Sequence, residues 1–214
     1  MTIAPTVSLL GGETASCALR CRIRLRHLYP VTGLLTILSW VFLAGPCSHA
    51  QQPKSNEFQV KAAYLYNFGR FVEWPDANGS EKNQSFEICV LGTDPFGQTL
   101  DAALASGSID GKSVAAKRIS KPQDVDSCRI LFISSSEQGH LKEVLTALDK
   151  ASVLTVSDIP RFSQRGGMIG FILDGNRVRF DVNLASAQSA RLTLSSELLK
   201  VATNVRKDPD RGDF

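Results

Sequence analysis

Residues 128–136 read Cys-Arg-Ile-Leu-Phe-Ile-Ser-Ser-Ser, which is an unbroken apolar run from Ile130 to Ile133 closed by three serines. A strand with one face in water alternates apolar and polar residues, whereas a strand covered on both faces is apolar throughout. Residues 130–133 are therefore predicted to form a central strand of a sheet with helices on both faces.

The segments around this run alternate between short β-rich stretches and helical patterns. Further strands are predicted at 86–91, 114–119 and 153–156. Helices are predicted from Glu57 to the Glu73-Trp74-Pro75 sequence, from Asp94-Pro95 through Leu104, and over 141–148. Strands that alternate with helices form βαβ units, and these units build a largely parallel sheet.

The C-terminal third has a different pattern. Residues 168–173 and 177–183 flank Asp174-Gly175-Asn176, a turn sequence that tolerates positive φ, so an antiparallel hairpin is predicted there. Two helices should follow, one around 185–190 and one from a serine cap at Ser195 or Ser196 to about Val205. The predicted fold class is α/β, a three-layer sandwich with a mostly parallel sheet and a C-terminal antiparallel hairpin.

The first fifty residues have the organisation of a signal peptide. Four arginines precede an uncharged apolar run, Val31 to Ala44, and the sequence Ser48-His49-Ala50 follows. A basic region, an apolar core and a small-x-small site predict export to the periplasm with cleavage after Ala50. A membrane anchor is the alternative, although the apolar run is shorter than the ~20 residues of a spanning helix.

Removal of residues 1–50 also changes the charge balance and the cysteine content. The leader contains four of the 24 basic and one of the 21 acidic residues, so the mature chain has no formal net charge. Such a balance disfavours nucleic acid and anionic lipid as partners. Only Cys89 and Cys128 remain, and in an oxidising compartment they are predicted to form a disulfide. Two buried thiols are the alternative.

The mature chain lacks the usual sequence signatures of catalysis. It retains a single histidine, His140, and it has no Walker sequence or dinucleotide-binding fingerprint. Its carboxylates are scattered, so local geometry brings no acid–base pair together. No enzymatic activity, cofactor or metal is therefore predicted.

Two groups of residues are candidates for binding. Ser134, Ser135 and Ser136 follow the central strand, where open α/β sheets often bind small anions, but serines there also cap helices. Trp74 stands outside the periodic pattern of its helix. It is either a partner-facing anchor or a plug over the sheet.

Several ordered sequence blocks resemble the YfiR family, also known as DUF4154. The resemblance covers about Glu57 to Val205, and the predicted organisation is a leader (1–50), a YfiR-like domain (57–205) and a disordered tail (206–214). The blocks are 61–75 (KAAYLYNFGRFVEWP), 88–92 (ICVLG), 94–97 (DPFG), 128–134 (CRILFIS), 153–158 (VLTVSD), 166–169 (GGMI) and 178–183 (VRFDVN).

The resemblance implies a periplasmic regulator that binds the periplasmic domain of a membrane diguanylate cyclase, or of a related sensor, and represses it. An outer-membrane OmpA-like lipoprotein can sequester such a repressor, and the sequence leaves a homodimer open. Cys89 and Cys128 match the family's common cysteine pair, whereas a second pair found in some members is absent from 162–170. The candidate partner-binding residues are Glu73, Trp74, Arg177 and Arg179. A periplasmic small-ligand binder that uses Ser134, Ser135 and Ser136 is the alternative function.

Overall fold

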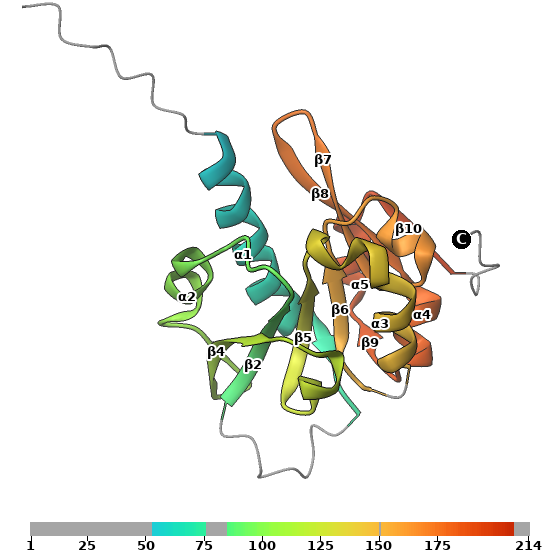
Figure 1. The fold of residues 1–214 in the computed structure, drawn as a ribbon, viewed down its shortest axis with the longest axis horizontal. Helices are drawn as coiled ribbons and strands as arrows, with labels where there is room; N and C mark the ends of the chain where they lie inside the picture. Colours follow the sequence, from blue (N-terminus) through green and yellow to red (C-terminus); the bar gives the residue numbers. More distant parts are fainter. Residues whose placement is uncertain (1–52, 76–84, 150, 208–214) are drawn as a thin grey trace, which may run out of the picture. The chain divides into compact units, whose positions relative to one another are not determined.

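The computed structural model describes residues 53–75, 85–149 and 151–207 (Figure 1). The predicted signal peptide and most of the predicted C-terminal tail lie outside these residues. The chain divides into two units at His49–Ala50, and everything described below belongs to the second. No helix in the described part of the chain is both long and apolar enough to cross a membrane.

An eight-stranded sheet forms the middle layer, with the order β10-β8-β7-β6-β5-β2-β4-β3. Strands β4, β2, β5, β6 and β7 are parallel, β7 and β8 form the predicted antiparallel hairpin, and β10 is parallel to β8. The strand bounds are β2 Ser85–Leu91, β3 Ser108–Ile109, β4 Lys112–Ile119, β5 Cys128–Ile133, β6 Leu154–Ser157, β7 Ile169–Asp174, β8 Arg177–Asn183 and β10 Asn204–Arg206.

Strand β5 occupies the predicted central position between β2 and β6. Ile130 and Phe132 belong to one buried core cluster, and Leu131 and Ile133 belong to a second cluster on the opposite face. All four side chains are fully buried. The apolar run is therefore explained by burial on both faces, as predicted.

Helices cover the two faces unequally. The first core cluster includes residues of α1, α2, α4 and α5, whereas α3 and the short 3₁₀ helix η2 contribute to the second. The helix bounds are α1 Pro53–Phe71, α2 Gln98–Leu104, α3 Leu141–Ala147, α4 Leu184–Ser189 and α5 Ser196–Val201, and the 3₁₀ helices are η2 Pro122–Val125, η3 Ser135–His140 and η4 Phe162–Arg165. This arrangement confirms the three-layer α/β class.

Two helices begin and two end away from the predicted residues. The first helix begins at Pro53 and not at Glu57, and the helix predicted from Asp94-Pro95 begins at Gln98. The first helix stops at Phe71, and Val72–Glu73 forms a short strand, β1, that pairs with β9 (Thr193–Leu194) in a separate antiparallel sheet. The last helix stops at Val201, and the chain then adds β10 to the edge of the main sheet. Both strands are too short to carry a recognisable alternation, and both depend on partners distant in the sequence.

Candidate functional site

The β7–β8 hairpin presents two chemically different faces. Phe180 and Val182 are buried against the core, while Arg177 and Arg179 are exposed. Arg179 forms a salt bridge with Asp174 across the hairpin, with 3.0 Å between Nε and Oδ2. Side chains of β8 therefore alternate between a face turned to the core and a face turned to solvent. Figure 1 shows the end of the hairpin extending beyond the neighbouring strands.

Glu73 and Trp74 lie apart from the hairpin end. The hairpin turn lies at the carboxyl ends of the parallel strands. Strand β1 follows the C-terminal end of α1 and lies toward the opposite, amino ends (Figure 1). Glu73 is exposed, but Trp74 is only 7% exposed and its ring meets that of Phe86 edge-on, with 5.3 Å between centroids. Trp74 thus has the position of a plug, and the predicted partner-binding residues do not form one surface.

The three serines after β5 have the geometry of a cap. Ser134 is buried, and its Oγ accepts a hydrogen bond from the backbone N–H of Ser136 at the start of η3. Ser136 Oγ accepts from the N–H of Thr93 and donates to Glu137. Ser135 is exposed. The hydroxyls of Ser134 and Ser136 are therefore already engaged, and binding of a small ligand here stays a prediction.

A cavity of about 250 Å³ lies near the amino end of β6. Residues near the start of β6 and in α3 and α4 line it, including Thr155, Leu145 and Ala185. This cavity was not predicted from the sequence, because small side chains such as Ala185 and Ser186 carry no chemical signature. It is separate from the predicted serine site.

A buried lysine joins α1 to the end of β6. Lys61 is 4% exposed, and its Nζ lies 2.8 Å from Asp158 Oδ2 and 2.6 Å from Glu57 Oε1. The same ammonium group lies over the rings of Phe58 and Phe171. This cluster was not predicted from the sequence, although Lys61 is four residues before Leu65 on the buried face of the helix. A charged residue among the apolar residues of this helix face was the available signal of a buried ion pair.

A second ionic cluster fixes the start of α2. Arg118 on β4 binds Asp101 through both terminal nitrogens, at 2.6 and 2.7 Å, and its Nε lies 2.9 Å from Asp94 Oδ2. Hydrogen bonds from Arg118 lower the pKa of the Asp101 carboxyl below its ordinary value. Their effect is larger than the opposite effect of desolvation, which raises this pKa. Hydrogen bonding to Asp101 in turn raises the pKa of Arg118. The cluster is a structural contact between helix and sheet.

Replacing Arg118 with methionine should destabilise the domain modestly and in a pH-dependent way. Because the pKa of Asp101 is lowered by folding, its contribution is present above the unfolded pKa of about 3.9 and disappears as the pH falls through the folded value. Asp101 is half exposed, so solvent screening limits the effect to about 1 kcal/mol at neutral pH. Urea unfolding of both proteins should show this difference at neutral pH and a smaller one near pH 3. An equal difference at both values would contradict the assignment.

The predicted disulfide is present in the structure. Cys89 on β2 and Cys128 on β5 are bonded, with 5.8 Å between their Cα atoms and a sequence separation of 39. The β2–β5 register shifts here: Glu87 pairs with Cys128, and the next residue, Ile88, pairs with Ile130. The extra residue in β5, Arg129, turns Cys128 onto the face that carries Cys89. The irregularity is what allows the bridge.

The parallel sheet, the interstrand bridge and the extended hairpin define a disulfide-stapled three-layer α/β domain. Residues 58–203 match the family model described as YfiR/HmsC-like, DUF4154. The chain belongs to this family.

Solved structures similar to this chain are distant in sequence. A conserved domain protein from Vibrio cholerae O1 biovar El Tor shares 12% identity, with a TM-score of 0.46 over 72% of this chain and 60% of that chain. The ABC domain in complex with L-Trp from Streptococcus pneumonia shares 10% identity, with a TM-score of 0.48 over 67% of this chain and 60% of that chain. This chain thus spans about three fifths of each. A comparison with curated proteins finds no match.

Proposed function

We propose that the protein binds the periplasmic domain of an inner-membrane diguanylate cyclase, or of a related sensor, and holds it inactive, which lowers cyclic di-GMP. Membership of the YfiR/HmsC-like family supports a regulatory role in this pathway. The observation that carries the proposal is the β7–β8 hairpin, which offers an extended surface for binding a partner protein.

The hairpin has the chemistry of a binding arm. Its apolar face continues past the core, since Leu173 pairs with Val178 beyond the buried Phe171–Phe180 pair, and Leu173 is 57% exposed. The opposite face carries Arg177 and Arg179. Arginine beside exposed apolar surface is a common energetic anchor at protein interfaces. The arm therefore suits a partner that has both apolar and acidic surface.

Glu73 offers a second and separate contact. Glu73 lies toward the amino ends of the parallel strands, and the hairpin turn lies at their carboxyl ends. A partner bound to the hairpin end would therefore not cover Glu73. An OmpA-like lipoprotein that sequesters the repressor would then engage it at β1, through a surface separate from the one that binds the cyclase. Trp74 would hold the β1 segment in place through its packing on Phe86.

Deletion of the gene should raise cellular cyclic di-GMP, and expression of the wild-type protein should restore the original level. A variant with Arg177→Glu and Arg179→Glu should fail to restore it, because two charge reversals at anchor positions weaken binding by about 2–4 kcal/mol, or roughly 30- to 1,000-fold. The matched control is Lys121→Glu with Lys200→Glu, which reverses two exposed charges on residues outside the hairpin. Each variant is first checked for export and for a wild-type circular dichroism spectrum.

The outcomes separate the function from the surface. An unchanged level of cyclic di-GMP in the deletion strain would contradict the repressor proposal and favour the small-ligand alternative at Ser134, Ser135 and Ser136. If the deletion raises the level but the hairpin variant complements fully, the function stands and the choice of surface is wrong.

A further inference from the structure

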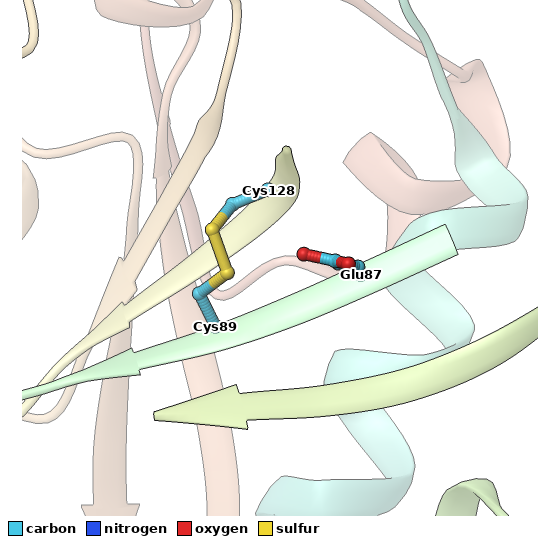
Figure 2. Close-up of side chains that lie close together, drawn as sticks. All are labelled: Glu87, Cys89 and Cys128. Atoms are coloured by element: carbon cyan, nitrogen blue, oxygen red, sulfur yellow. A yellow bond between two sulfur atoms is a disulfide. The ribbon is translucent and has the colours of Figure 1, made fainter. Parts of the chain in front are cut away.

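Three potential metal ligands lie together: the two sulfur atoms of the disulfide and a nearby carboxylate. Glu87 and Cys89 are two residues apart on β2 and therefore point to the same face, and Cys128 lies opposite Glu87 on β5. Figure 2 shows the three side chains together on the two neighbouring strands. A carboxylate oxygen of Glu87 and the two sulfur atoms all lie within 4.8 Å of one another.

The oxidised protein does not use these sulfurs as ligands, because the thiolate is the form of cysteine that binds metals. A dithiol reductant opens the bridge: it transfers two electrons and two protons to the sulfurs, which become two thiols, and is itself oxidised to a disulfide. A divalent cation then displaces the two thiol protons to solvent and forms two metal–sulfur bonds and one bond to the carboxylate.

The backbone already has the spacing that such a centre needs. Two sulfurs bound to one tetrahedral zinc ion at ~2.3 Å lie about 3.8 Å apart. The Cα atoms of Cys89 and Cys128 are 5.8 Å apart, so rotation of the side chains can separate the sulfurs by this amount. Hydrogen-bonded neighbours hold both strands on each side, β4 and β6 being the outer ones, and this keeps the ligands together after reduction. The Glu87 side chain is 24% exposed, which gives water access to the fourth position.

The surrounding charges fit both states. Lys117 pairs with Cys89 across β4 and β2, and its Nζ lies 3.6 Å from Glu87 Oε2. It also donates to Ser127 Oγ, which donates to the same carboxylate. With the bridge intact, Lys117 neutralises Glu87. With a divalent cation, two thiolates and the carboxylate in place, Lys117 offsets the single negative charge of the complex. The region is therefore neutral either way.

We propose that the reduced protein binds one zinc-class divalent cation through Cys89, Cys128 and Glu87, so that the disulfide and the metal are alternative states of the same site. Thiolate and carboxylate ligands select zinc, or cobalt as its spectroscopic substitute, over hard cations such as magnesium. Bound metal would hold β2 to β5 when the bridge is open and would protect the thiols from oxidation.

Titration with cobalt tests this proposal. The full chain, with Cys17, Cys21 and Cys47 replaced by serine, is reduced anaerobically and freed of reductant, so that Cys89 and Cys128 are the only thiols. Cobalt should produce thiolate-to-cobalt charge-transfer absorption at one equivalent, and zinc should remove it. The oxidised protein should show none. Glu87→Gln should weaken binding at least tenfold, the loss typical when a metal site is damaged, whereas the exposed Glu143→Gln should bind as the wild type does.

A second measurement covers the effect of reduction on folding. Zinc should slow alkylation of both thiols in the reduced protein. The zinc-bound protein should also show the circular dichroism spectrum of the folded state, whether reduction alone preserves that spectrum or zinc restores it. Absence of the charge-transfer band would overturn the proposal. So would equal cobalt affinity of Glu87→Gln and the wild type, and so would binding by a chain that stays unfolded.

Discussion

Replacing Lys61 with alanine is expected to lower the free energy of unfolding by about 3 kcal/mol. The change leaves the carboxylates of Glu57 and Asp158 beside each other without their shared cation, and losing one partner of a buried ion pair costs about 3–5 kcal/mol. The lower value is appropriate because these carboxylates retain 23% and 20% exposure. Asp158 Oδ1 is buried and has no hydrogen-bond partner among the described residues, so the Asp158 carboxylate depends on Lys61 through its other oxygen.

Urea unfolding of Lys61→Ala, Asp158→Ala and the double variant measures this contribution. The double-mutant cycle should give a coupling energy above about 1 kcal/mol, as expected for residues in direct contact. Lys200→Ala, at an exposed lysine in the last turn of α5, should change stability by less than about 0.5 kcal/mol. Additive effects of the two single changes would show that Lys61 and Asp158 do not stabilise each other.

Local sequence patterns were sufficient for most of the fold. The run from Ile130 to Ile133 has no polar position, and burial on both faces of the sheet accounts for this. Asp174-Gly175 provides a residue that adopts φ 59° in the hairpin turn. Gly69 lies within the predicted first helix, but its role emerges only in the structure, since a Cβ there would lie 2.5 Å from Ile109.

The missed strands depend on contacts that no local pattern encodes. Val72 pairs with Leu194, and β10 pairs with β8 through Val205 and Val182. Such short segments gain their structure from the partner strand and not from their own propensity. The sequence favoured continued helices because the preceding residues have helical spacing.

The candidate site shows the same division between local and distant contacts. The hydrogen bond that Ser134 Oγ accepts from the N–H of Ser136 joins adjacent residues, so this cap is encoded locally. The plug position of Trp74 depends on Phe86, and the ion pair of Lys61 depends on Asp158, which is 97 residues away. The β5 irregularity that aims Cys128 at Cys89 has no sequence signature, although the pairing of these cysteines was predicted from their number and compartment.

Loss of the Cys89–Cys128 bridge is expected to have the largest effect on stability. The bridge closes a loop of 39 residues, and removing the bridge should restore chain entropy to the unfolded state worth about 4 kcal/mol. For a domain of this size, the melting temperature should fall by about 8–16 °C. Secondary structure should persist at room temperature, because β2 and β5 retain their hydrogen-bonded neighbours.

Thermal unfolding with and without a phosphine reductant, in the presence of a metal chelator, provides the measurement. The double variant Cys89→Ala/Cys128→Ala supplies the matched control, since a reductant should lower the melting temperature of the wild type and leave that of the variant unchanged. Cys89 is fully buried and Cys128 is 5% exposed, so the reductant reaches the sulfurs mainly when the strands open. Reduction should therefore accelerate with temperature before the unfolding midpoint. A wild-type melting temperature that stays constant after both thiols are shown to be free would mean that the sheet alone, and not the bridge, sets the stability of the domain.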